Sequence, residues 1–198
     1  RGEKITGSHT ERRKLTIFFS DIKAFTDTTD SLEAEELSNL LNEYLTEMTA
    51  IAMKHGGTID KFIGDAVMIF FGAPETKGDR EDALQCLRMA VAMQGRMKEL
   101  QAKWFKQGIE RPLQIRIGVN TGIATVGDFG AEERLSYTTI GGQVNLASRL
   151  ESICEPGKIL ISHATWALVS DEFPCTPKGE VQVKGIHHDV LVYEVGTG

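Results

Sequence analysis

The sequence predicts an α+β fold with a ferredoxin-like βαββαβ core, followed by additional C-terminal strands and a helix. Three observations favour this class. Residues 14–22 and 58–71 are apolar runs rich in β-branched and aromatic side chains, as in buried strands. Residues 37–52 repeat apolar side chains at three- and four-residue spacing, which is typical of one helix face. The patterns follow the order strand, helix, strand, strand, helix, strand, with helices expected on one face of an antiparallel sheet.

The first strand follows a polar, aperiodic segment, 1–13, which we interpret as a linker or arm from a larger protein. The run "KLTIFFSDI" at 14–22 is that strand. Asp30 and Glu33 have the spacing of a capping box and predict the start of the first helix. The glycines at 56–57 indicate its end. The apolar positions of this helix are Leu37, Leu40, Leu41, Tyr44, Leu45, Met48, Ile51 and Ala52.

A hairpin and a second helix come next. The segment "TIDKFIGDAVMIFFG" places Gly64 and Asp65 between two apolar runs, a strong signal for a tight turn. The second helix covers about 79–107. Its apolar side consists of Leu84, Leu87, Val91, Met93, Met97, Leu100 and Trp104.

The rest of the chain completes the core and extends it. A third helix, 143–153, stops before Pro156. A short helix and two more strands close the chain, the last ending at "VLVYEV". The other expected strands are 113–122, 123–130, 134–141 and 158–162.

Composition limits the classes of partner. A chain of 198 residues with 41% hydrophobic and 25% charged residues suits one globular domain. The net charge of −6 excludes a partner held mainly by its phosphate backbone, and no aromatic platform motif supports RNA binding, so we expect no nucleic acid partner. No apolar run approaches 18 residues, so this fragment carries no predicted membrane segment.

The three cysteines and the first residue bear on the setting of the domain. Cys86, Cys154 and Cys175 are odd in number, widely spaced and without a Cys-x-x-Cys motif. This pattern favours reduced thiols and a cytoplasmic location. The chain begins at Arg1 rather than Met, so we expect a fragment of a longer protein.

Two carboxylates stand where the core strands end. Asp21 closes the first strand and Asp65 lies at the hairpin turn, and these strands are neighbours in a βαββαβ sheet. Two carboxylates brought together repel unless a cation lies between them. Hard divalent ions such as Mg²⁺ or Mn²⁺ suit such a pair and usually bind together with substrate phosphates. Each aspartate alone also fits a simple turn or cap, but the pair favours a metal site.

Polar residues near these aspartates suggest a nucleotide, although each has a simpler explanation. Backbone N–H groups from Ile22 to Thr26 could hold a triphosphate, as helix N-termini do. Lys61 stands on the same hairpin as Asp65, and alone it fits a solvated strand lysine. Asn145 and Arg149 share one helix face at i, i+4 spacing, and an amide beside a guanidinium suits ribose and phosphate. An exposed polar helix face explains that pair equally well.

Several segments together resemble the catalytic domain of class III nucleotidyl cyclases, in the order of that family and over about residues 14–195. The segments are "FFSDIKAFT", "GGTIDKFIGDAVMIFFGAP", "IRIGVNTGIATVGDFG", "ERLSYTTIGGQVNLASRLE" and "VKG". The resemblance implies a catalytic domain at 14–196. It also implies conversion of a nucleoside triphosphate to its 3′,5′-cyclic monophosphate and pyrophosphate, with two divalent cations, Mg²⁺ or Mn²⁺.

The resemblance assigns metal-binding and purine-reading roles. Asp21 and Asp65 match the metal-binding aspartates, and Ile22 would offer its backbone carbonyl. Lys61 and Thr138 match the two purine-reading positions, where lysine with threonine or aspartate is typical of adenylyl cyclases. Glutamate with cysteine is typical of guanylyl cyclases. A lysine donates to adenine N1, whereas guanine N1 carries a hydrogen and favours a carboxylate.

The resemblance implies contacts to ribose and phosphates for the other matching residues. Asn145 would orient the ribose, Arg149 would stabilise charge on the α-phosphate, and Lys184 would hold the terminal phosphates. Phe25 and Thr26 belong to the expected phosphate loop. Two departures from the family pattern, Ala24 and Gly142, replace a usual glycine and a usual aspartate, and neither removes a catalytic group.

The resemblance also implies how the domain assembles. In the family, one protomer supplies the metal-binding aspartates, and its partner supplies the purine lysine, the asparagine and the arginine. Since this chain carries both sets, we expect a head-to-tail homodimer with two shared sites that act on ATP. Thr138 resembles the soluble, bicarbonate-responsive subgroup, so bicarbonate is a possible regulator.

Three other functions remain open. A guanylyl cyclase is the nearest, although Lys61 argues against it. A regulatory cyclase homology domain that binds nucleotide without turnover is another. A diguanylate cyclase or polymerase on a similar sheet lacks support, because its Gly-Gly-Asp/Glu turn is absent.

Overall fold

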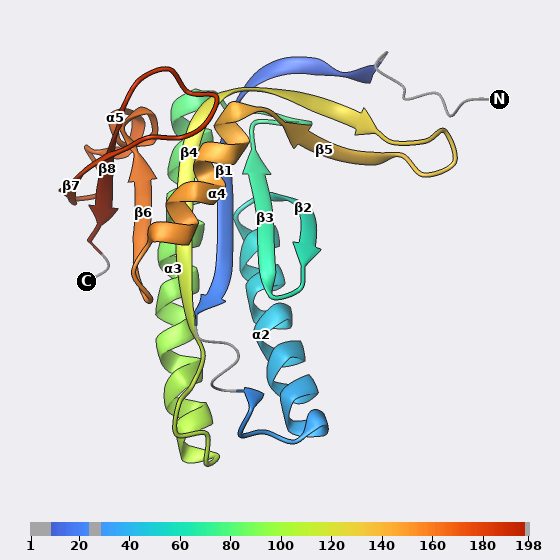
Figure 1. Ribbon diagram of the computed structural model, residues 1–198, viewed down its shortest axis with the longest axis vertical. Helices are drawn as coiled ribbons and strands as arrows, with labels where there is room; N and C mark the ends of the chain where they lie inside the picture. Colours follow the sequence, from blue (N-terminus) through green and yellow to red (C-terminus); the bar gives the residue numbers. More distant parts are fainter. Residues whose placement is uncertain (1–8, 24–28, 197–198) are drawn as a thin grey trace.

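The computed structural model describes residues 9–23 and 29–196. Its sheet has the order β2-β3-β1-β4-β6-β8-β7, with β5 paired to β4 (Figure 1). The strands are β1 (Glu11–Lys23), β2 (Thr58–Ile63), β3 (Ala66–Phe71), β4 (Gln114–Phe129), β5 (Ser136–Ile140), β6 (Ile159–Ser162), β7 (Cys175–Val181) and β8 (Val190–Val195). The helices are α2 (Ala34–Lys54), α3 (Asp79–Lys106), α4 (Gly142–Ile153) and α5 (His163–Val169).

The predicted α+β class and βαββαβ core are confirmed. β4, β1, β3 and β2 lie side by side and are antiparallel, with α2 and α3 as the two connecting helices. The strands after α4 extend this sheet, because β6 pairs parallel to β4 and β8 pairs antiparallel to β6. The expected short helix and two final strands are also present.

The two faces of the sheet carry separate apolar cores. On one face, Phe18 and Ile69 pack among the buried residues of α2 and α3, including Tyr44 and Trp104. On the other face, Leu15, Ile17 and Phe70 pack with Ala147 of α4. This division follows from the alternation of side chains along β1.

Three expectations about the elements are wrong in detail. The strand expected at 14–22 extends over 11–23, because its first residues pair with β4. The strands expected at 113–122 and 123–130 are one continuous strand, β4. Asp30 does not begin a capping box, since α2 begins after Glu33 and no side chain caps it. The two core helices, α2 and α3, share one face of the sheet as expected, and the additional helix α4 covers the opposite face (Figure 1).

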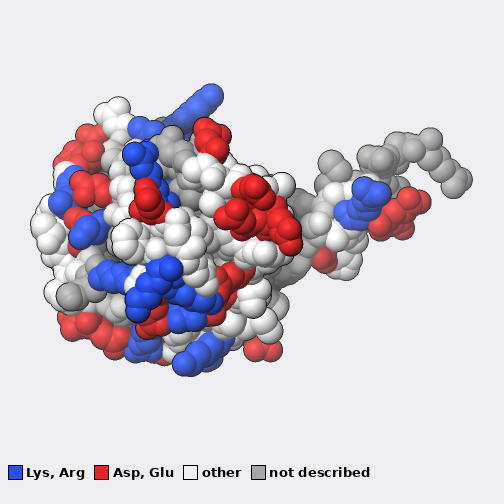
Figure 2. Space-filling view, turned by 90° about the horizontal axis from the view of Figure 1, so that it is seen from below, with Lys and Arg blue, Asp and Glu red and all other residues white. Residues whose placement is uncertain are grey.

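The start of β1, the end of β4 and β5 form a long arm that projects from the domain. The first residues of β1 pair with residues 124–126 of β4, and β5 pairs with residues 125–129 of the same strand. Figures 1 and 2 show this arm standing out from the rest of the molecule. Ile123 and Ile140 at its base are about half exposed (54% and 50%), so the arm offers apolar surface to another molecule.

The described surface carries charges of both signs. On the face seen in Figure 2, clusters of Lys and Arg lie next to clusters of Asp and Glu rather than forming one basic face. Within the described ranges, no helix is both long enough and apolar enough to cross a lipid bilayer.

Candidate active site

The hairpin turn between β2 and β3 brings one expected metal ligand to the end of β1. Asp65 Oδ2 accepts a hydrogen bond from the backbone N–H of Ile22 at 2.8 Å. Because Ile22 directly follows Asp21, the two aspartates lie at the same end of the sheet. The structure therefore brings together Asp21, Ile22 and Asp65, as the sequence led us to expect.

Asp21 is bound by an arginine on the neighbouring strand. Arg116 lies directly across from it in the β1–β4 ladder and donates to both carboxylate oxygens, Nε to Oδ1 at 2.9 Å and Nη2 to Oδ2 at 2.6 Å. Burial disfavours the charged form of Asp21, but the hydrogen bonds outweigh it and hold the pKa of Asp21 below its usual value. Arg116 Nη1 also donates to the carbonyl of Ser152 at 2.8 Å and ties the end of α4 to this site.

A third carboxyl group, that of Glu151 on α4, borders the pair. Its side chain is 10% exposed, and Oε1 lies 3.4 Å from Arg116 Nη2. That oxygen is buried without a hydrogen-bond partner in the described part of the chain. Burial and the neighbouring carboxylate of Asp21 raise the pKa of Glu151 to about 8. The end of β1 is thus an acidic centre balanced by one guanidinium.

These residues suit a divalent cation that arrives with its substrate. Asp21 and Asp65 provide hard oxygen ligands at the same end of the sheet, and one oxygen of the nearby Glu151 is buried without a donor. Over residues 9–23 and 29–196, no group of three or more His, Cys, Asp or Glu side chains is arranged to hold a metal ion. A pair of carboxylates completed by phosphate oxygens fits this arrangement better than a cage made by protein alone.

The two expected purine-reading residues meet at a buried aspartate. Thr138 of β5 donates from Oγ1 to Asp60 Oδ2 at 2.5 Å, and Lys61 Nζ lies 3.7 Å from Asp60 Oδ1. The side chain of Asp60 is 2% exposed, whereas that of Lys61 is 47% exposed. Lys61 and Thr138 thus come together at Asp60 from two strands far apart in the sequence.

The helix residues expected at the ribose and phosphates lie on the surface of α4. Asn145 and Arg149 are both exposed, while Ala147 and Leu150 are buried, so the polar face of α4 points outward. The helix begins at Gly142 after Gly141, and no side chain caps it. An exposed pair of this kind is available to a substrate or a partner chain.

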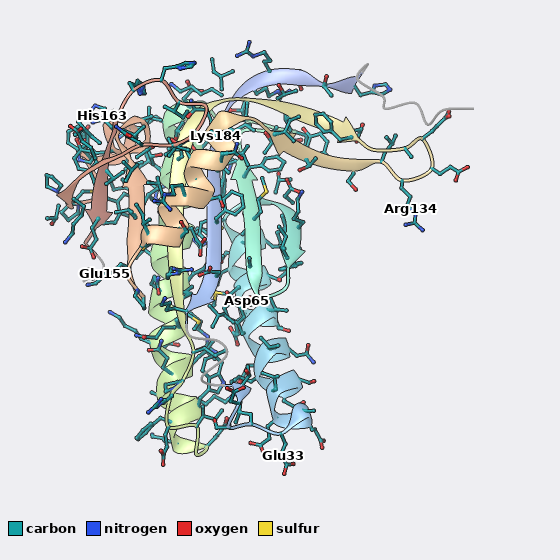
Figure 3. The ribbon with its side chains drawn as sticks, in the orientation of Figure 1. Glu33, Asp65, Arg134, Glu155, His163 and Lys184 are labelled. Carbon is teal, nitrogen blue, oxygen red and sulfur yellow. The ribbon has the colours of Figure 1, made fainter. Side chains whose placement is uncertain are left out.

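Lys184 lies in an exposed loop at the other end of α4 from the acidic centre. A Cβ placed on Gly142 would come 3.7 Å from the carbonyl oxygen of Gly185, so this loop covers the start of the helix. Figure 3 shows Lys184 beside that start and Asp65 near the lower end of the β2–β3 hairpin. One chain therefore does not bring Lys184 to its own Asp65.

Two further expected residues cannot be placed. Phe25 and Thr26, with Ala24, lie outside the described residues, so the phosphate loop stays a prediction. Conversely, the sequence interpretation assigned no role to Asp60, Arg116 or Glu151. The signal for Arg116 was a charged residue within the apolar strand "IRIGV", and for Glu151 a carboxyl group next to the buried Leu150.

Known proteins resemble this chain in sequence and in fold. A family model described as "Adenylate and Guanylate cyclase catalytic domain" matches residues 8–196. The chain is 35% identical over 191 residues to a Dictyostelium discoideum protein named "Adenylate cyclase, terminal-differentiation specific", covering 94% of this chain and 9% of that protein. It spans between 9% and 39% of the length of the curated adenylate cyclases that it matches.

Two solved structures extend the comparison to the fold. The crystal structure of the adenylyl cyclase CyaB from P. aeruginosa has 55% sequence identity and a TM-score of 0.91, covering 94% of this chain and 95% of that chain. The crystal structure of the guanylyl cyclase Cya2 has 37% identity and a TM-score of 0.86, covering 94% and 93%.

Proposed function

The chain belongs to the family of adenylate and guanylate cyclase catalytic domains, and on that premise we propose that it converts ATP to 3′,5′-cyclic AMP and pyrophosphate. The observation that carries the choice of ATP is the purine-reading pair. Lys61 can only donate a hydrogen bond, which suits adenine N1, and Thr138 lies close enough to share one base with it. The proposed catalytic domain includes the whole of β1, from Glu11, and extends to residue 196, since the family model matches residues 8–196.

The acidic centre is the proposed site of two divalent cations, Mg²⁺ or Mn²⁺. Asp21 and Asp65 would hold them, with the carbonyl of Ile22, and the contact between Ile22 and Asp65 supports this assignment. When bound, the cations supply positive charge that stabilises the attacking 3′-oxygen and the leaving pyrophosphate. The proton of the ribose 3′-hydroxyl passes to a carboxylate oxygen of Asp21 or to water.

The remaining residues position the substrate. Asn145 orients the ribose, and Arg149 stabilises the negative charge that develops at the α-phosphate. Lys184 binds the β- and γ-phosphates, together with backbone N–H groups at Phe25 and Thr26. Most of the rate acceleration then comes from positioning and charge stabilisation, as in other phosphoryl transfers.

The domain acts as a head-to-tail homodimer with two shared sites. The acidic centre of one protomer faces the purine pair, Asn145 and Arg149 of the other. Two observations support sharing: Asn145 and Arg149 are exposed, and Lys184 lies apart from Asp65 within one chain. The apolar surface on the arm adds area that a partner could bury.

Two further features of the proposal concern regulation and location. Thr138 supports membership of the bicarbonate-responsive subgroup. All three cysteines are free, which suits the reducing cytoplasm.

Nucleotide turnover tests the proposal directly. The purified chain is incubated with ATP or GTP and with Mg²⁺ or Mn²⁺, and cyclic AMP and cyclic GMP are measured with and without bicarbonate at one fixed pH. Cyclic AMP formed much faster than cyclic GMP supports an adenylyl cyclase. Preferential formation of cyclic GMP identifies a guanylyl cyclase instead, and binding of nucleotide without product identifies a regulatory homology domain.

A further inference from the structure

Asp60 stands at an irregular point of strand β2. The pairing of β2 with β3 shifts register between Ile59 and Lys61, which leaves Asp60 as the extra residue of a β-bulge. Successive side chains of a regular strand point to opposite faces, whereas a bulge can re-aim a side chain. The approach of Asp60 Oδ1 to Lys61 Nζ at 3.7 Å shows that these consecutive side chains turn toward each other.

The carboxylate of Asp60 uses up the only proton of the Thr138 hydroxyl. A threonine hydroxyl has one O–H donor and two acceptor lone pairs. Thr138 Oγ1 donates to Asp60 Oδ2 at 2.5 Å, and the Asp60 side chain is almost fully buried, so water does not compete for this bond. Toward a bound base, Thr138 therefore offers lone pairs alone.

We propose that Asp60 is a specificity-determining residue, which fixes Thr138 as a hydrogen-bond acceptor and so selects a 6-amino purine over a 6-oxo purine. This inference rests on the proposed function, in which Lys61 and Thr138 read the base. Adenine presents an acceptor at N1 and a donor at the 6-amino group, which match Lys61 and Thr138 in turn. A 6-oxo purine presents a donor at N1 and an acceptor at O6. Its donor then faces the Lys61 donor, and its acceptor faces the lone pairs of Thr138.

Asp60 also acts on Lys61. The ammonium group of Lys61 is half exposed, and the nearby carboxylate restricts where it lies. One buried side chain thus sets the orientation of both base-reading groups. Asp60 is a positioning residue, because it acts through Lys61 and Thr138 and is not itself proposed to touch the substrate.

The variant Asp60→Asn reverses the polarity while keeping the size of the side chain. Lys61 attracts the amide oxygen of the asparagine, which turns the NH₂ group toward Thr138. Thr138 then accepts that hydrogen bond and can donate its own proton to a 6-oxo group. We expect the ratio of kcat/KM for ATP to that for inosine triphosphate to fall about tenfold or more. Inosine triphosphate differs from ATP only at the edge that Lys61 and Thr138 would read.

A matched control separates this effect from loss of stability. Asp82 is also buried, and its Oδ2 also accepts from a threonine hydroxyl, Thr76 Oγ1, at 2.5 Å, but it lies at the start of α3. Asp82→Asn removes a comparable interaction and is expected to leave the ATP-to-inosine-triphosphate ratio unchanged. In a Thr138→Val background, Asp60→Asn is expected to change the ratio no further, because the hydroxyl that it acts on is gone.

Every outcome bears on the inference. Equal loss of both activities in Asp60→Asn, with the ratio unchanged, overturns it and leaves Asp60 a structural residue. If Asp60→Asn does not fold, the wild-type enzyme is tested with two substrates. Its kcat/KM for ATP is expected to exceed that for the 6-unsubstituted purine riboside triphosphate about tenfold, and equal values overturn the inference. If the wild type forms no cyclic nucleotide, the proposed function fails. The ratio of dissociation constants for ATP and inosine triphosphate, measured by calorimetry with Mn²⁺ in the same variants, then tests Asp60 alone.

Discussion

The backbone N–H of Ile22 and the carboxylate of Asp65 are joined by a 2.8 Å hydrogen bond, which fixes the hairpin turn to the end of β1. Asp21 precedes this contact directly, and its carboxylate is held by Arg116. The acidic centre is therefore built from β1, β4, the β2–β3 turn and α4, with Asp65 bound to the backbone of Ile22 and Asp21 bound to a guanidinium. Each contact leads to a different prediction.

Asp21→Asn is expected to reduce cyclic AMP formation at least about a hundredfold, because it removes one of two proposed metal ligands. The protein is expected to remain folded but to lose about 1–2 kcal/mol of stability, since Arg116 loses its charged partner. The measurements are cyclic AMP formed per minute and the free energy of unfolding in urea.

The stability part distinguishes two views of this residue. If Asp21 were an unpaired carboxylate in an empty metal site, it would destabilise the folded protein, and Asp21→Asn would gain stability. Because Arg116 lowers the pKa of Asp21, its charged form is already favoured, and removal costs stability. Near-normal turnover in Asp21→Asn would contradict the metal assignment.

Arg116→Gln is expected to strengthen binding of Mn²⁺ to the nucleotide-free protein about tenfold. Arg116 occupies both oxygens of Asp21, so a cation must displace it, and glutamine removes that competition. Titration calorimetry with Mn²⁺ measures the affinity. Arg96→Gln is the control, because Arg96 forms a similar two-bond contact with Glu47 on the surface of α2 and α3. Equal or weaker affinity in Arg116→Gln argues that Arg116 does not compete with the cation.

Much of the fold could be predicted because local patterns agree with it. The turn at Gly64 and Asp65, the apolar face of α2 and the bounds of α3 each follow from a few neighbouring residues. The continuity of β4 could not be predicted, because Asn120 and the glycines in its middle favour a break. Pairing with β1 on one side and with β5 and β6 on the other overrides that preference.

The candidate site divides in the same way. Asp21, Asp65, Lys61 and Thr138 could be named from motifs, and their roles stay predictions. Arg116 and Asp60 could not, since their importance depends on which residue lies across a ladder or beside a bulge. Register and bulges are tertiary properties, which a single strand sequence does not specify.

Gly118→Ala is expected to destabilise the protein by about 2 kcal/mol or more, because α4 packs directly on the backbone of β4 there. A Cβ on Gly118 would lie 2.2 Å from the backbone nitrogen of Glu151. Gly95→Ala in α3 is the control, since a Cβ there meets nothing within 4 Å, and helix propensity predicts a gain of about 0.5–1 kcal/mol. Chemical denaturation measures both. Equal effects at the two glycines would contradict the close packing of α4.

Glu151 predicts how the stability of the metal-free protein depends on pH. A carboxyl group whose pKa rises from 4.5 to about 8 on folding binds more protons in the folded state across that window. The stability contributed by Glu151 is then fully present below the lower value and falls as the pH rises toward 8, by on the order of 4 kcal/mol. Glu151→Gln is expected to remove this fall. Urea denaturation in EDTA measures this fall between roughly pH 5 and pH 8.5, the range over which Glu151 titrates. Parallel pH profiles of variant and wild type would contradict the raised pKa of Glu151.

Shared sites predict complementation between two inactive variants. Asp65→Ala removes a proposed metal ligand from the acidic centre. Arg149→Ala removes the guanidinium that the partner's α4 would contribute to the same site. In a mixed dimer, one site carries both changes and the other carries neither. Random pairing of equal amounts places half of the chains in mixed dimers with one working site each, so activity is expected to return to about a quarter of the wild-type value.

A second mixture shows whether that recovery reflects shared sites. Asp65→Ala combined with Asp21→Ala places both changes in the acidic centre, so each site of a mixed dimer lacks one metal ligand, and no activity is expected. Cyclic AMP formation in both mixtures, after the chains are unfolded and refolded together, provides the measurement. Recovery in the first mixture alone means that the acidic centre and Arg149 come from different chains. Absence of recovery in both, with mixed dimers demonstrated by mass spectrometry of the assembly, means that each chain builds its own site.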